Sequence, residues 1–207
     1  MPPVDERTAH IARAVRIKRN NAITAVIAGT ALAGFLAKAS SSVQTYGTFV
    51  IGLLAGLLYA NIFEYVLHRF FLHWGEGFLV KRHALHHDSA GAVDEARYVN
   101  FATSPWIVVL VIVLNAPAAI VVEKLVHASV APGMLVGFTL YYIAYEEIHW
   151  RIHFGGWLPR WLRFARRHHM LHHADFKGYY NVFLPICDWL FQRHKWKPPG
   201  RDAAPYS

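Results

Sequence analysis

Cysteine is nearly absent from this sequence, since Cys187 is the only one in 207 residues. A single cysteine excludes an internal disulfide and any metal cluster held by cysteine thiolates. Acidic residues are also scarce, with 13 Asp and Glu against 21 Lys and Arg. The chain is rich instead in histidine, with fourteen copies. If this protein binds metal, imidazole nitrogens are therefore the expected ligands.

Several functional motifs are missing as well. No evident nucleophile, carboxylate pair or phosphate-binding loop supports hydrolysis or group transfer. The net charge of +8 is not accompanied by a nucleic-acid-binding motif, because the Lys and Arg residues flank long apolar runs. Anionic lipid headgroups are the expected partner of these cations, and nucleic acid is not. The length suits one domain over residues 1–207.

Four apolar runs approach the length that a helix needs to cross a membrane. They are Ala22–Ala37, Phe49–Leu67, Trp106–Val122 and Val130–Tyr145. The fourth is short, but its helical character continues through His149 and predicts a helix that leaves the membrane. The sequence therefore predicts an all-α integral membrane protein with about four transmembrane helices.

The charges of the connections predict the orientation. The first and third connections carry one basic residue each, Lys38 and Lys124, whereas residues 1–20, 81–105 and the chain after Arg151 are strongly basic. Because Lys and Arg accumulate on the cytoplasmic side, we expect both termini there, together with a helical cap. We expect a multi-pass protein of a bacterial inner membrane rather than the endoplasmic reticulum.

Small residues recur at four-residue spacing in the first two runs. Gly29 with Ala33 and Gly52 with Gly56 fit the small-xxx-small pattern of closely packed membrane helices. We expect these two helices to pack against each other. The alternative is that glycine is simply frequent in membrane helices.

Ten histidines form four clusters on the predicted cytoplasmic side. The clusters are His68 and His73; His83, His86 and His87; His149 and His153; and His169, His172 and His173. Residues three and four apart share a helix face, so the last three clusters can each present their imidazoles together. His68 and His73 cannot face one point from a regular α-helix, because five residues rotate by about 140°. Either the helix ends between them or they serve different metals.

Ten imidazoles shared between two metal ions would give five each and leave one octahedral position open for O2. Imidazole suits iron, zinc, copper and nickel, so the ligands do not name the metal. A structural zinc protein needs only four ligands per ion. A metal transporter remains a non-enzyme alternative, although its histidines should line the middle of the spans.

Carboxylates near the clusters are candidates to orient the histidines through their second nitrogen. They are Glu64, Glu146 and Asp175, and the alternative is ordinary ion pairing such as Glu147 with Arg151. A helix is predicted over Trp157–His173, with His169 and His172 on its apolar stripe.

The other four histidines are predicted to lie outside the site. His168 is expected on the arginine face of the Trp157–His173 helix, because it is rotated by about 100° from His169. His10, His127 and His194 have no histidine partners in the sequence and are expected at the surface.

The order of the clusters resembles that of the fatty acid hydroxylase and sterol desaturase superfamily, namely HX3–4H, HX2HH, HX3H and HX2HH. The flanking residues Glu64–Arg69 and Cys187–Phe191 are also similar to the family. The resemblance covers about Phe49–Arg193, with the histidine boxes in residues 61–193, and looks closest to the fatty acid hydroxylases.

This resemblance implies two iron ions bound by the ten histidines, for which zinc is a possible substitute in purified protein. It also implies O2-dependent hydroxylation of an aliphatic C–H bond in a lipid, with a fatty acyl chain favoured. Desaturation, or a sterol or carotenoid substrate, is the alternative. No His-Pro-Gly-Gly haem motif occurs in the sequence. Electrons are therefore expected from a separate protein, such as a ferredoxin or cytochrome b5 with its reductase.

Overall fold

The computed structural model describes residues 5–191, and all regular secondary structure in that range is helical. The long helices are α1 (Glu6–Ala39), α2 (Tyr46–Val66), α5 (Pro105–Val126) and α6 (Ala131–Phe154). The short elements are the π-helix η1 (Leu67–Leu72), α3 (Phe78–Asp88), α4 (Ala96–Val99), the 3-10 turn η2 (Arg160–Leu162), α7 (Arg163–Ala174) and α8 (Ile186–Phe191). The predicted all-α class is confirmed for the described residues.

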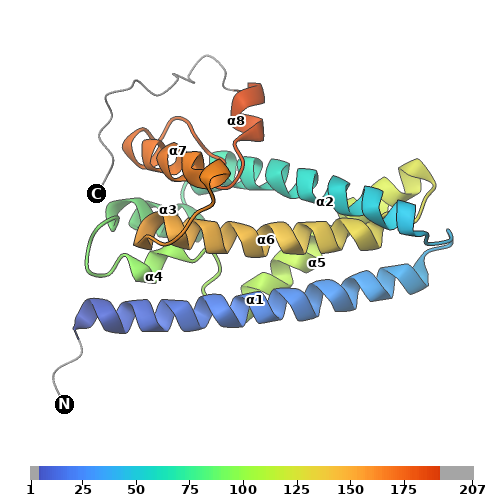
Figure 1. The fold of residues 1–207 in the computed structure, drawn as a ribbon, viewed down its shortest axis with the longest axis horizontal. Helices are drawn as coiled ribbons and strands as arrows, with labels where there is room; N and C mark the ends of the chain where they lie inside the picture. The colour runs from blue at the N-terminus through green and yellow to red at the C-terminus, as the bar shows by residue number, and fades with distance from the viewer. Residues whose placement is uncertain (1–4, 192–207) are drawn as a thin grey trace.

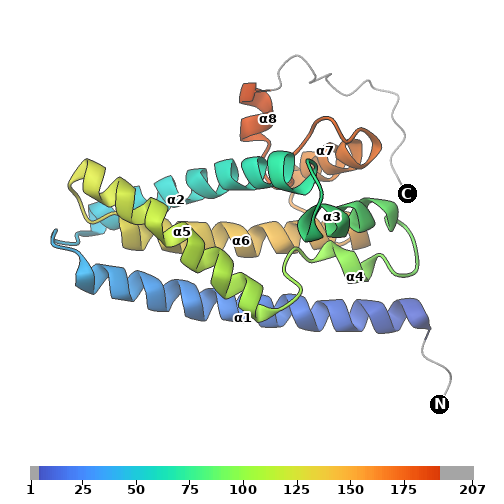
Figure 2. The ribbon, with the colours of Figure 1, turned by 180° about the vertical axis from the view of Figure 1, so that it is seen from behind.

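Helix α6 is the central element of the bundle. It lies between α1 and α2 in Figure 1, and α5 crosses it on the other side of the molecule in Figure 2. Fifteen of its 24 residues are buried, so α6 is enclosed by its neighbours. The short helices α3, α4 and α7 gather around η1 and the last turns of α6 (Figure 1). We call this part of the molecule the histidine end.

Three helices are long and apolar enough to cross a membrane, which indicates a membrane protein. They are Glu6–Ala39, Tyr46–Leu72 and Pro105–Val126. The fourth predicted run lies in α6, which is not among them because its tyrosines and glutamates lower its hydropathy. Helix α6 does continue through His149 to Phe154, as the sequence predicted. The number of spans remains a prediction.

Helix α1 begins much earlier than the first apolar run. It starts at Glu6 and includes most of the basic segment 1–20. Its 34 residues extend over about 51 Å, whereas the hydrocarbon core of a bilayer is about 30 Å thick. The basic first half of α1 can therefore lie outside the core, alongside the histidine end.

Gly52 and Gly56 of α2 contact α6, and α1 also packs against α6 and not mainly against α2, so the predicted packing of the first helix against the second is wrong. A Cβ atom on Gly52 would lie 2.2 Å from the carbonyl oxygen of Val130, and one on Gly56 equally close to that of Met134. Gly29 of α1 also meets α6, at Thr139. The spacing identified surfaces of close approach, but small residues on one helix do not specify which partner helix they meet.

Helix α7 is shorter than predicted. The chain from Gly155 to Pro159 is not helical, and both Gly155 and Gly156 have positive φ angles. A single 3-10 turn then leads into α7 at Arg163. His169 and His172 are buried, as their predicted place on the apolar side of this segment implies, and so are Leu158, Leu162 and Ala165.

Candidate metal centre

The π-helix η1 brings the first two histidines together. His68 lies in η1 and His73 directly follows it. In a π-helix the hydrogen bonds run from residue i to residue i+5, so residues five apart lie about one turn apart. The two imidazole rings stack with their centroids 5.1 Å apart. The helix ends between them at Leu72, which is one of the two expected alternatives, and the wider π-helical turn lets both rings face the same cluster.

In space, the ten histidines of the four sequence clusters gather in two neighbouring groups. These two groups are called the first and the second cluster from here on. The first cluster is His68, His73, His83, His87 and His172, whose ring nitrogens all lie within 4.8 Å of one another. The second contains His86, His153, His169 and His173 within the same limit. His149 completes it, because its Nε2 lies 3.0 Å from Nε2 of His169. Each cluster thus holds five imidazoles.

Each three-histidine box is divided between the two clusters. His83 and His87 of α3 enter the first cluster, while His86 between them enters the second. Helix α7 does the reverse, with His172 in the first cluster and His169 and His173 in the second. Residues four apart are nearly aligned on a helix, and the residue three positions on is offset to one side. The shared face of each helix therefore points between the clusters.

The nitrogen positions fit a metal ion better than hydrogen bonds. Nε2 of His83 lies 3.0 Å from Nε2 of His68 and of His73, and 2.9 Å from that of His87. One imidazole nitrogen has either one N–H or one lone pair, so it cannot hydrogen-bond to all three. A metal–nitrogen distance of about 2.1 Å puts adjacent donors of an octahedron about 3.0 Å apart. The first cluster could therefore hold an ion.

The second cluster repeats this arrangement around His169. Its Nε2 lies 3.0 Å from Nε2 of His149 and of His153, and 3.1 Å from that of His173. Iron and zinc both accept imidazole ligands, so this geometry does not separate the two metals.

Burial keeps the imidazoles of His73, His172 and His173 neutral. Burial away from water lowers the pKa of His73 to about 4, and those of His172 and His173 to about 3. Desolvation disfavours the charged imidazolium, and only a neutral ring offers a lone pair to a metal. At neutral pH protons therefore compete weakly for these nitrogens.

Three histidines are oriented through their second nitrogen. His153 Nδ1 lies 2.8 Å from the carboxylate of Glu95, and both side chains are almost completely buried. His172 Nδ1 donates to the carbonyl of Gly178 at 2.6 Å, and His68 Nδ1 donates to the carbonyl of Tyr180. Sequence reasoning missed Glu95 because it lies in the connection after α3, far from His153 along the chain and without a motif.

Among the described residues, the hydrogen bonds of the three candidate orienting carboxylates go to groups other than the cluster histidines. Glu64 accepts hydrogen bonds from Tyr141, Asn181 and Val182. Glu146 accepts from the backbone of Phe101 and Ala102 and from the hydroxyl of Tyr142. Asp175 accepts from the backbone of Lys177. The ion pair of Glu147 with Arg151 is confirmed at 2.6 Å. Sequence proximity did not identify the atoms that these carboxylates reach.

His168 lies outside both clusters, as predicted, but not on an exposed arginine face. It is 6% exposed, and its Nε2 lies 2.9 Å from Asp188 of α8. His10 lies 3.5 Å from Glu6, and His127 is exposed at the end of α5. His194 falls outside the described residues.

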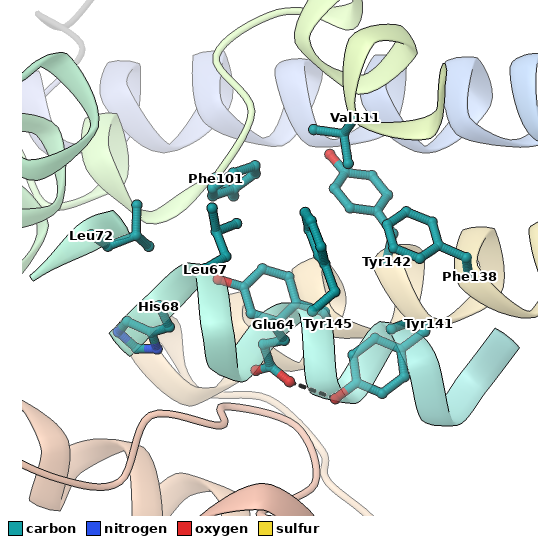
Figure 3. Close-up of a pocket in the computed structure, with 12 residues that line it drawn as sticks. Glu64, Leu67, His68, Leu72, Phe101, Val111, Phe138, Tyr141, Tyr142 and Tyr145 are labelled. Carbon is teal, nitrogen blue, oxygen red and sulfur yellow. Dashed lines mark hydrogen bonds between the residues drawn. The ribbon is translucent and has the colours of Figure 1, made fainter. Parts of the chain in front are cut away.

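An apolar cavity, partly open to the surroundings, lies beside the first cluster (Figure 3). Side chains of α2, α5 and α6 line it, among them Phe63, Val111 and Phe138, and His68 borders it. A second cavity touches histidines of both clusters. The walls shared by the two cavities are His68, Leu72, Phe101 and Tyr145. The apolar space therefore adjoins the space beside the candidate ligands.

The sequence and the fold both match known proteins. Residues 53–193 match the family described as fatty acid hydroxylase. Among solved structures, the fold resembles full-length Scs7p, in which only the hydroxylase domain is visible, with a TM-score of 0.60 and 19% identity. That match covers 83% of this chain and 64% of the Scs7p chain. No match was found among curated proteins. Because the family match includes more than half of the sequence, the chain belongs to the fatty acid hydroxylase family.

Proposed function

We propose that this protein is an O2-dependent di-iron hydroxylase that inserts an oxygen atom into an aliphatic C–H bond of a lipid, with a fatty acyl chain as the substrate. The observation that carries the proposal is the pair of five-histidine clusters beside an apolar cavity. The family supports hydroxylation. Substrate class and metal identity are part of the proposal.

The ten histidines would hold two iron ions. Five imidazoles for each ion would leave room for O2 to bind. Bound iron would supply O2 activation, with two electrons from a separate donor such as a ferredoxin or cytochrome b5 with its reductase. One oxygen atom would enter the C–H bond, and the other would take up the two electrons and two protons and leave as water. The contribution of the chain is to fix the imidazoles through Glu95 and the carbonyls of Gly178 and Tyr180.

The apolar cavity would bind the acyl chain. An aliphatic C–H bond has no charge that the protein can polarise, so positioning and exclusion of water are the main contributions of the residues around it. Phe63, Val111 and Phe138 offer an apolar wall, and Phe101 and Tyr145 stand where the two cavities adjoin. A chain in the first cavity would have its target carbon directed toward the histidines.

The position of the histidines favours an enzyme over a metal transporter. A transporter should carry its ligands along the middle of the membrane spans. Here the clusters lie at one end of the bundle, in η1, α3, α7 and the last turns of α6 (Figure 1). We propose that this end faces the cytoplasm of a bacterial cell, where soluble reductants have access to it.

Labelled oxygen tests the proposed reaction. Cells that express the protein, grown under 18O2 with an electron donor, should contain a fatty acyl lipid with one 18O atom bound to carbon. Cells that express His172→Ala should lack it, because one ligand of the first cluster is missing. A new double bond without label would establish a desaturase instead. Labelled sterols or carotenoids would change the substrate class, and unchanged lipids would reject the enzyme.

A further inference from the structure

A short loop supplies both backbone carbonyls that orient histidines of the first cluster. Within this loop, Gly178–Asn181, the carbonyl of Gly178 accepts from His172 Nδ1 and the carbonyl of Tyr180 accepts from His68 Nδ1. Both histidines are buried, with exposed fractions of 0% and 4%. A proton held on Nδ1 leaves the lone pair on Nε2, directed toward the cluster. The position of the loop therefore sets the direction of two candidate ligands.

The loop needs support from other elements. Between its two accepting carbonyls, Tyr179 has a φ of 63°, a left-handed conformation that residues other than glycine rarely adopt. Such a conformation persists where the surroundings hold it in place. The same segment is held on one side by Glu64 of α2, which accepts hydrogen bonds from the Asn181 side chain and the Val182 N–H.

Asp188 of α8 holds the other side of the loop. Its Oδ1 accepts the N–H of Tyr180 at 3.0 Å, and its Oδ2 accepts the N–H of Asn181 at 2.8 Å. Oδ2 also lies 2.9 Å from Nε2 of His168 in α7. Asp188 is only 3% exposed, so water does not replace these contacts. The carboxylate thus joins α7, α8 and the loop at one point.

We propose that Asp188, oriented by His168, is a positioning residue for the first cluster alone. It fixes the loop whose carbonyls hold His68 and His172, and it touches no candidate ligand itself. The second cluster is supported differently, through Glu95 on His153. This inference rests on the proposed function in one respect, namely that the first cluster binds a metal ion.

Asp188→Asn is the most direct change because it preserves the size of the side chain. An amide has only one acceptor oxygen, so either Tyr180 or Asn181 would lose its acceptor and face an NH2 group. Changes in the outer shell of a metal site commonly weaken binding by about 10–100-fold. We expect that loss at the first cluster, with little change at the second.

The full chain can be loaded with 57Fe(II) without oxygen, challenged with a chelator series and examined by iron counting and Mössbauer spectroscopy. The variants His73→Ala and His153→Ala each remove a ligand from one cluster, and so assign the two iron signals. Asp188→Asn should release the first-cluster iron at about 10–100-fold lower chelator concentration and keep the second-cluster signal. Glu95→Gln should release the second-cluster iron at lower chelator concentration and keep the first-cluster signal.

A pair of His168 variants gives a second test if Asp188→Asn does not fold. His168→Gln retains an N–H donor for Asp188, whereas His168→Phe removes it and keeps a ring in the buried site. The Phe variant should weaken first-cluster iron more than the Gln variant.

The outcomes separate this inference from the proposed function, because the readout does not depend on lipid oxidation. A parent chain that binds no ion at the first cluster overturns both, whereas one that binds an ion there and none at the second cluster overturns the di-iron proposal alone. If the parent binds two, unchanged iron retention in Asp188→Asn, or equal loss from both clusters, overturns the role of Asp188 alone.

Discussion

His86 and His172 occupy different clusters, although each is the middle histidine of a His-x-x-His-His box. We expect two metal ions per chain, and we expect His86→Ala and His172→Ala each to abolish lipid oxidation and lower the metal content, because each removes one donor from one ion. Metal analysis of protein purified anaerobically checks this. His127→Ala is the matched control, since His127 is exposed at the end of α5. A parent value near one ion per chain would contradict the assignment.

The carboxylate of Glu95 lies 2.8 Å from His153 Nδ1. Glu95→Gln should lower metal affinity at the second cluster by about 10–100-fold, because a neutral amide orients the imidazole less strongly than a carboxylate. Chelator competition measures the change. The neighbouring variant Asp94→Asn is the control, because Asp94 is more exposed and its side chain bonds no histidine. Equal affinities for the two variants would show that Glu95 has no such role.

The residues of the site were largely recognisable from the sequence, and their partners were not. Spacing alone selected the ten histidines that the fold brings together. Glu95 and Asp188 were missed because their contacts join segments that are distant in the chain. His168 was expected on the arginine face of its helix. It is buried because α8 contacts it, and the sequence around His168 does not reveal a contact with a later helix.

At the scale of the elements, α2 and α6 meet through glycine. Gly52→Ala should destabilise the protein by about 1–3 kcal/mol, because the added methyl group would collide with the backbone carbonyl of Val130. Thermal unfolding in detergent measures this. Gly34→Ala in α1 is the control, since a Cβ there meets no other atom within 4 Å. Similar melting temperatures for the two variants would show that α2 and α6 accommodate the added methyl group without a loss of stability.

The long elements were predictable because long apolar runs report helices directly. Errors arose where local geometry departs from a regular α-helix. The π-turn η1 was not foreseen, because nothing in residues 67–72 distinguishes it from the α-helix it continues. Helix α7 begins at Arg163 and not at Trp157, because residues 157–159 are not helical and a 3-10 turn follows Pro159.

For the whole molecule, the basic connections predict that both termini and the histidine end lie in the cytoplasm. A reporter that is active only in the periplasm or lumen should remain inactive when fused to Ser207. The same reporter inserted at Ser41, between α1 and α2, should be active because that connection lies at the opposite end of the bundle (Figure 1). The reversed pattern would overturn the orientation and separate the clusters from cytoplasmic reductants.

The sequence alone determined the helical class, the apolar runs and the ten histidines, because hydropathy and helical spacing are local properties of the chain. Only the tertiary structure decided which histidine enters which cluster, which helix occupies the centre and which groups orient the imidazoles. Those outcomes depend on contacts between distant segments. Helix α6 shows the difference: it reads as a marginal span, yet packing on three sides by α1, α2 and α5 makes it the core on which the site is built.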